Sequence, residues 1–206
     1  MFSNTITQAM NNLWPLLTIV LVVLIAVRIA YIRNNSKEFV LYREVLNLVF
    51  VIYLLLLFEM VTNKDISGTS GINLVPFTEI FRYSFGSKQF LYNVVGNIAV
   101  FVPFGYFVSY IIRSKKVGSI FLITLITSFT IEFVQLRIGR AFDIDDIILN
   151  VVGGIAGWLL YIGLSAIKNH LPKIFRKDII YNILCVILLI VMILYAANIF
   201  GFGWKF

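Results

Sequence analysis

Six long apolar runs dominate the pattern of hydrophobic and polar positions along the chain. Each comes close to the roughly 20 apolar residues that a helix needs to cross the hydrocarbon core of a bilayer. Helices are expected because a backbone in hydrocarbon has to be hydrogen-bonded within its own segment, and the runs do not alternate as barrel strands do. The predicted spans are Leu13 to Tyr31, Leu41 to Val61, Leu91 to Ile112, Val117 to Leu136, Ile147 to Ile167, and Ile179 to Phe200. The pattern therefore predicts an all-α integral membrane protein with about six transmembrane helices.

The long connection from Thr62 to Phe90 carries an apolar pattern of its own. After Pro76, apolar residues recur at helical spacing, namely Phe77, Ile80, Phe81 and Phe85. Glu79 and Arg82 would face the opposite way. This spacing predicts a short amphipathic helix in the outer membrane interface. The segment is then either a loop attached to the bilayer or a lid over a cleft that opens to the outer leaflet.

Composition indicates lipid as the solvent of these helices. Hydrophobic residues make up 60% of the chain and charged residues 13%, whereas a soluble domain carries about 25% charged residues. The net charge of +7 does not indicate a nucleic-acid partner, because the basic residues lie between the spans, where membrane topology places them.

The distribution of Lys and Arg predicts the orientation, since basic residues concentrate on the cytoplasmic side. The first, third and fifth connections hold ten of them: Arg33, Lys37, Arg43, Arg113, Lys115, Lys116, Lys168, Lys173, Arg176 and Lys177. The other side holds six: Lys64, Arg82, Lys88, Arg137, Arg140 and Lys205. We therefore expect both termini on the outer side.

Polar side chains within the spans are costly and usually mark a site. Near the outer end of the third span, Asn93 and Asn97 lie four residues apart and share a helix face. The fourth span carries a polar stripe at steps of four, four and three: Thr124, Ser128, Glu132 and Gln135. A carboxylate at the depth of Glu132 has to be either paired or protonated.

The connection RIGRAFDIDDIILN leads into the fifth span. Asp143 can cap the start of this helix, and Asp146 then lies in its first turn. Asp146 and Asn150 are four residues apart and share a face.

Two further features of the sequence predict the geometry of the helices. Pro103 removes a backbone donor in the third span, which favours a kink. Gly153 and Gly157 form a small-xxx-small pair that lets another helix approach the fifth span closely.

Eight polar residues near the outer ends of the third, fourth and fifth spans form one candidate cluster: Asn93, Asn97, Glu132, Gln135, Arg140, Asp143, Asp146 and Asn150. The cluster is either a hydrogen-bond network that holds three helices together or a ligand or catalytic site. In a site, Glu132 and Asp146 can act as general acid and base, and Arg140 can hold a phosphate or carboxylate. No metal or other cofactor is expected, because DIDD lacks regular ligand spacing and the chain has no zinc motif or nucleotide-binding loop.

Four stretches carry a family resemblance: NLVPF at Asn73 to Phe77, NVVGNIAVFVPFGY at Asn93 to Tyr106, IEFVQ at Ile131 to Gln135, and GRAFDIDDIILNVVGGIAG at Gly139 to Gly157. Together they resemble the VanZ-like membrane protein family. The resemblance covers about residues 41–164, so we expect a single membrane domain over residues 1–206 with additional spans at 13–31 and 179–200. It implies a bacterial cell-membrane protein. The founding member of the family protects Gram-positive bacteria against teicoplanin, a lipid-tailed antibiotic, and not strongly against vancomycin. No established catalytic residues follow from the resemblance.

Four functions remain open at this point, and the weakest is a transporter, because no pair of matched broken helices marks inverted repeats although Pro103 permits one broken helix. The protein can handle a membrane lipid or a lipid-linked cell-wall precursor at the outer leaflet, which would affect a lipoglycopeptide antibiotic indirectly. It can be an enzyme that modifies a lipid head group with Glu132 and Asp146. It can also be a structural or scaffolding membrane protein. The sequence leaves the oligomeric state open.

Overall fold

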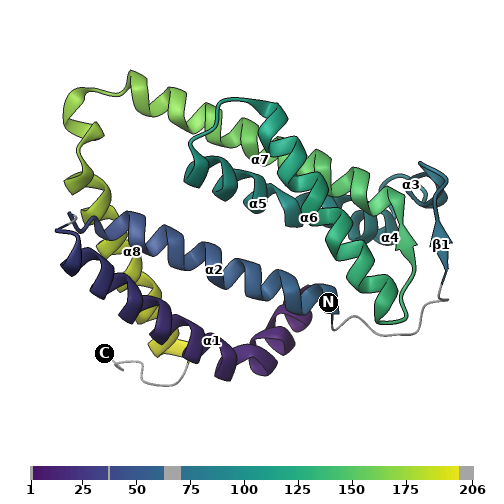
Figure 1. The fold of residues 1–206 in the computed structure, drawn as a ribbon, viewed down its shortest axis with the longest axis horizontal. Helices are drawn as coiled ribbons and strands as arrows, with labels where there is room; N and C mark the ends of the chain where they lie inside the picture. The colour runs from purple at the N-terminus through teal and green to yellow at the C-terminus, as the bar shows by residue number, and fades with distance from the viewer. Residues whose placement is uncertain (1, 37, 63–70, 200–206) are drawn as a thin grey trace. The chain divides into compact units, whose positions relative to one another are not determined.

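The structure is a computed structural model that describes residues 2–36, 38–62 and 71–199, with side chains from 13 to 194 within these ranges. Long helices follow the apolar runs (Figure 1). They are α1 (Phe2–Asn34), α2 (Leu41–Thr62), α5 (Gly96–Ile112), α6 (Val117–Arg137), α7 (Ile144–His170) and α8 (Asp178–Ile199). Four residues that were used in these predictions lie outside the described residues. They are Lys37, Lys64 and Lys205, which were counted for the orientation, and Phe200, which ends the sixth predicted span.

Within the described ranges, five helical stretches are long and apolar enough to cross a membrane: Leu13–Asn34, Leu41–Thr62, Lys88–Ile112, Val117–Arg137 and Ile144–His170. The apolar described part of α8, Asp178–Leu194, is shorter. Large apolar side chains on these helices are widely exposed, as Ile126, Phe129 and Phe133 are on α6. A surface of this kind fits lipid as the surrounding solvent. The predicted all-α membrane architecture is confirmed, and the number of spans stays a prediction.

The chain divides into two compact units. One comprises Met1–Pro15 and Tyr53–Ala166, and the other comprises Leu16–Ile52 and Ile167–Phe206. In the second unit, polar contacts join the starts of α2 and α8. The Arg43 guanidinium lies 2.8 Å from the Asp178 carboxylate, and the Tyr42 amide donates to the Asn182 side chain. Arg28 on α1 donates to both carboxylate oxygens of Glu44 on α2.

The first unit contains the three helices α5, α6 and α7, which lie side by side in Figure 1. Glycines bring α5 and α7 into backbone contact. A Cβ atom placed on Gly153 would lie 2.2 Å from the Ile98 carbonyl oxygen, and one placed on Gly157 would lie 2.1 Å from that of Val102. Gly105 of α5 faces Gly154 of α7 in the same way, at 1.9 Å. The predicted close approach through Gly153 and Gly157 is confirmed.

The segment before α5 is less regular than predicted. The expected amphipathic helix is the short α3 (Thr78–Arg82), which is followed by α4 (Lys88–Phe90) and a π-helical turn over Leu91–Val95. Tyr83 leaves α3 in an extended conformation, and Gly86 then adopts a φ of 78°. The side chains of Phe81 and Phe85 are 80% and 92% exposed.

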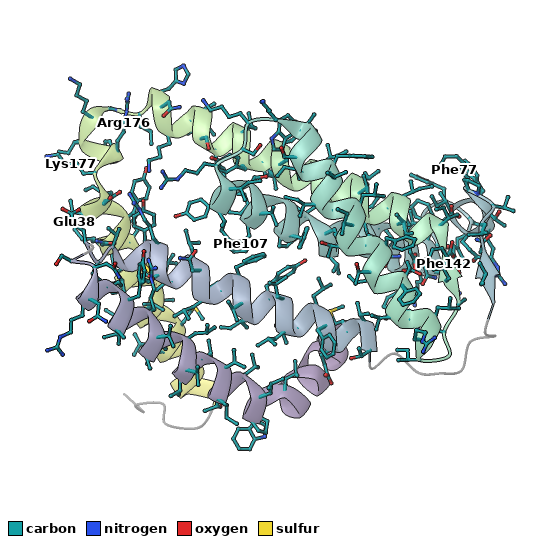
Figure 2. All side chains as sticks on the ribbon, viewed as in Figure 1. Glu38, Phe77, Phe107, Phe142, Arg176 and Lys177 are labelled. Carbon is teal, nitrogen blue, oxygen red and sulfur yellow. The ribbon has the colours of Figure 1, made fainter. Side chains whose placement is uncertain are left out.

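A two-residue parallel strand pair joins this segment to the start of α7. Strand β1 (Ile72–Asn73) pairs with β2 (Phe142–Asp143), with Asn73 opposite Asp143. Figure 2 labels Phe77 and Phe142 at this same end of the unit. Helix α5 continues through Pro103, and the Tyr53 hydroxyl donates to the Val100 carbonyl at 2.6 Å in the preceding turn. The kink itself stays a prediction.

Candidate polar site

A small polar cavity of about 60 Å³ lies where α5 and α7 begin and α6 ends. Six of the predicted site residues line it: Asn97, Glu132, Gln135, Arg140, Asp146 and Asn150. Apolar side chains complete the wall: Leu57, Met60, Val61, Val100, Phe101 and Ile131. The structure therefore brings most of the predicted cluster into one enclosure of about the size of a few water molecules.

The carboxylate of Glu132 is the most deeply buried charged group of the cavity, with 1% of the residue exposed. Its Oε2 atom accepts a hydrogen bond from the Asp143 amide at 3.0 Å. Gln135 satisfies both of its neighbours when its amide nitrogen faces Glu132. In this orientation it donates to Glu132 Oε1 at 2.9 Å and accepts from Arg140. Burial without such partners would be costly for a carboxylate.

Arg140 reaches the cavity from the connection between α6 and α7. Its guanidinium donates to the Val61 carbonyl at the end of α2, at 2.7 Å, and its backbone amide donates to the Gln135 carbonyl at 2.9 Å. The residue is thus attached to the ends of α2 and α6 while it lines the cavity. A guanidinium has five N–H donors, so Arg140 can also take a ligand oxygen.

The polar stripe of α6 faces the interior, as its spacing predicts. Thr124 and Ser128 are 0% exposed and Gln135 is 6% exposed. The Asn150 amide of α7 donates to the Ser128 hydroxyl at 2.9 Å. One turn earlier on α7, the Asp146 carboxylate accepts from the Asn97 amide of α5. These hydrogen bonds connect α7 to both neighbouring helices.

Asp143 caps α7, as its position predicts. Its Oδ1 atom accepts from the Asp145 amide at 2.9 Å and from the Asn73 side chain at 3.1 Å. Burial raises the pKa of the Asp143 carboxyl above its usual value, and the hydrogen bonds from the Asp145 amide and Asn73 oppose that rise. Asp143 is not among the described residues that line the cavity, so its role in ligand binding stays a prediction.

Asp145 has a structural role that was not predicted from the sequence. Its carboxylate is 99% buried and accepts backbone hydrogen bonds from Phe77 at 2.5 Å, Glu79 at 2.7 Å and Ile80 at 3.2 Å. It therefore caps α3 from another part of the chain. No local pattern marked this role, because the partners of Asp145 lie 65 to 68 positions earlier in the chain.

Phe77 precedes α3 with a φ of 69°, in the left-handed region. That conformation costs about 1–3 kcal/mol for a residue that is not glycine and persists only where surrounding contacts fix it. The hydrogen bond from the Phe77 amide to Asp145 is such a contact. The start of α7 thus fixes the shape of the segment before α5.

Asn93 is the second predicted residue that is not among the described cavity-lining residues, although Asn97 lines the cavity. Asn93 lies in the π-helical turn Leu91–Val95, and Asn97 follows in the regular helix α5. A π-helical turn contains an extra residue, so the faces before and after it are out of α-helical register. The simple four-residue spacing did not anticipate this turn.

The site combines opposite charges and amides in one small volume. Glu132 and Asp146 both line the cavity, as a general acid and base would have to, and Arg140 supplies the cation. Three amide side chains supply donors and acceptors: Asn97, Gln135 and Asn150. Among the described residues, no group of three or more His, Cys, Asp or Glu side chains is placed to hold a metal ion.

These residues lie in the part of the chain that a known family covers. The family model VanZ/LLP1 matches residues 39–169. The chain belongs to the VanZ/LLP1 family. Protein VanZ of Enterococcus faecium is 34% identical over 125 residues, which is 59% of this chain and 70% of the relative. No solved structure matches the chain.

The VanZ/LLP1 match contains the whole cavity, from α2 to α7, and leaves all of α1 and all of α8 outside. Together with the long apolar helices, it makes this chain a VanZ-like, multi-pass membrane protein. The predicted resemblance is confirmed.

Proposed function

We propose that this VanZ-like protein holds the polar head of a membrane lipid, or of a lipid-linked cell-wall precursor, in the cavity between α5, α6 and α7. By handling that molecule in the outer leaflet of the bacterial plasma membrane, it lowers sensitivity to lipoglycopeptide antibiotics such as teicoplanin. The observation that carries the proposal is the cavity itself, in which Arg140, Glu132 and Asp146 meet amide side chains at one end of three apolar helices.

The proposed arrangement in the membrane has six spans, with α8 as the sixth, and both termini outside. The cavity then lies at the outer leaflet, because α6 ends and α7 begins there. Helix α3, with the exposed side chains of Phe77, Phe81 and Phe85 nearby, lies in the outer interface beside it. Phenylalanine is among the residues that form the apolar face of helices in that layer.

The first test is antibiotic susceptibility in a Gram-positive host. We expect the wild-type chain to raise resistance to teicoplanin and to leave vancomycin resistance nearly unchanged. Glu132→Gln and Arg140→Ala should abolish the effect at normal membrane levels, measured by blot. Arg137→Ala is the matched control, because Arg137 is exposed and is not among the described lining residues, and it should behave as the wild type. Full protection by Arg140→Ala would contradict the proposed role of the cavity.

An enzyme that modifies a lipid head group is the second candidate, because both carboxylates face the same cavity. Glu132 and Asp146 would act as acid and base. Lipid extracts of cells with and without the protein decide this: a species that appears with the wild type and not with Asp146→Asn supports the enzyme. Identical profiles across the lipid classes contradict it.

A structural role is the third candidate, because the same polar groups connect the helices through the Asn97–Asp146 and Asn150–Ser128 hydrogen bonds. A purely structural cluster predicts that Glu132→Gln lowers the melting temperature and that any loss of protection follows the loss of protein. A fully expressed but inactive Glu132→Gln variant would exclude this candidate.

A further inference from the structure

An apolar groove adjoins the polar cavity. The groove has a volume of about 330 Å³ and lies between the end of α2 and the end of α6. Leu57, Val61 and Ile131 line both the groove and the cavity, so the two spaces are neighbours. The groove reaches the lower end of the size range of ligand pockets, about 300 Å³, whereas the cavity alone is far smaller.

The groove walls suit a hydrocarbon chain. On α2 they consist of Leu54, Leu57, Phe58 and Val61, and on α6 of Thr130, Ile131 and Val134. The Thr130 hydroxyl is already used, because it donates to the Ile126 carbonyl of its own helix at 2.8 Å. An occupant of the groove therefore meets apolar surface, while its end at Leu57 and Ile131 meets the charged cavity.

The charges of the cavity restrict the head group. One guanidinium, Arg140, faces two carboxyl groups, Glu132 and Asp146. Whether or not Glu132 carries a proton, the formal charge of these three groups is zero or negative. A head group with only negative charge would thus be attracted by Arg140 but repelled by Asp146. A zwitterion matches both signs, because its phosphate can pair with Arg140 and its cation with the carboxylates.

The size of the cavity and its hydrogen-bond acceptors determine which cationic group of a lipid head it can hold. A primary ammonium has three N–H donors, and Asp146, Asn97 and Asn150, whose side chains carry acceptor oxygens, are among the residues that line the space. A trimethylammonium group is bulkier and has no N–H donor. It could donate no hydrogen bond to these acceptors. The enclosure of about 60 Å³ therefore favours a small primary amine.

We propose that cavity and groove together bind one phospholipid with a primary amine in its head group, of the phosphatidylethanolamine class. The ammonium lies among Asp146, Asn97 and Asn150, the phosphate lies at Arg140, and one acyl chain follows the groove between α2 and α6. This inference rests on the proposed function, since it names the class of lipid that the same site takes.

Native mass spectrometry of the full-length protein in detergent tests the inference. The probes are phosphatidylethanolamine, its mono-, di- and trimethylated forms, and phosphatidic acid, all with the same two acyl chains. We expect phosphatidylethanolamine to bind at least tenfold more tightly than phosphatidylcholine and phosphatidic acid. Affinity should fall with each added methyl group. Tightest binding of phosphatidic acid, or equal binding along the methyl series, overturns the assignment of the amine.

Two pairs of variants locate the lipid. Asp146→Asn should remove the preference for the primary amine, whereas Asp178→Asn in the second unit should keep it. Val134→Trp fills the groove and should weaken binding of every probe at least fivefold, whereas Phe133→Trp, at an exposed position of the same helix, should not. Unchanged binding by Val134→Trp overturns the acyl-chain position. The methyl series on the wild type decides about the amine even where Asp146→Asn does not fold.

The same experiments distinguish a failure of the proposed lipid-handling function from a failure of the assignment to phosphatidylethanolamine. If the wild type retains none of the five lipids, or if Arg140→Ala retains all of them with unchanged affinity, the cavity is no lipid site and both proposals fall. If lipids bind and Arg140→Ala weakens them without any head-group preference, only the present inference falls.

Discussion

Three acids at the start of α7, Asp143, Asp145 and Asp146, have three different partners. Asp143 caps its own helix, Asp145 caps α3, and Asp146 accepts from Asn97 of α5. Consecutive helix positions point in directions about 100° apart, so neighbours in the sequence reach different elements. The motif DIDD is therefore a junction of α3, α5 and α7.

At the residue scale, Asp145→Asn should loosen the segment that holds α3. An amide side chain has one acceptor oxygen in place of two and no negative charge, so some of the three backbone amides lose their partner. A buried donor left without an acceptor costs about 1–3 kcal/mol. Hydrogen–deuterium exchange in detergent should show faster exchange at Phe77, Glu79 and Ile80. Asp178→Asn is the matched control at the start of α8 and should leave these amides protected.

Glu132 offers a second prediction at this scale. Glu132→Leu removes the acceptor of the Asp143 amide and of Gln135, whereas Glu132→Gln retains one acceptor oxygen. The leucine variant should therefore be less stable than the glutamine variant by about 1–3 kcal/mol, as read from thermal unfolding in detergent. Phe133→Leu, on the exposed side of α6, controls for a general loss of helix contacts. Equal stability of the two Glu132 variants would mean that the Asp143 amide has another acceptor.

Whether the role of a site residue could be predicted depends on how near its partners lie in the sequence. The cap by Asp143 was predictable because its acceptor role involves an amide two positions along the chain. The role of Asp145 was not predicted, because its partners lie 65 to 68 positions earlier and only the fold brings them near. The cavity residues were predictable from the cost of polar groups in apolar helices, and their pairing was not.

At the element scale, the contact between α5 and α7 depends on glycine. Gly157→Leu would place a side chain where the Val102 carbonyl lies 2.1 Å from the position of a Cβ atom. Backbone cannot move aside cheaply, so we expect loss of folded protein or a melting temperature lower by 10 °C or more, on the order of several kcal/mol. Gly163→Leu is the matched control on the same helix, because nothing lies within 4 Å of its added Cβ atom. It should express and melt as the wild type does.

Helix positions followed from the apolar runs, because a span has to be long and internally hydrogen-bonded whatever its neighbours are. The predicted start of α6 at Val117 agrees with the structure, and its end differs by one residue. The structure departs from the predicted helices where contacts between distant segments determine the local conformation. The π-helical turn at Leu91–Val95 and the brief α3, fixed by Asp145, have no marker in the periodicity of their own segments.

At the scale of the whole molecule, the orientation can be tested by cysteine labelling. In a Cys185→Ser background, Ser84→Cys lies in the connection proposed to be outside and Lys115→Cys in one proposed to be inside. Both positions are exposed. A membrane-impermeant maleimide added to intact cells should label the first and not the second, and both after lysis. The reverse pattern would invert the proposed topology and place the cavity at the cytoplasmic leaflet.

The hydrogen bonds between the α3 segment and Asp145 can form only after both parts of the chain have been synthesised. The Glu79 amide and its acceptor on Asp145 are separated by 66 positions, and ribosomes add about 5–20 residues per second. The segment around Phe77 therefore emerges roughly 3–13 s before its acceptor exists. Two apolar helices, α5 and α6, are inserted in that interval. During this interval Asp145 is not yet present to hold the backbone of the segment that carries the exposed phenylalanines. The conformation of the α3 segment is consequently fixed late, after α5 and α6 have been synthesised.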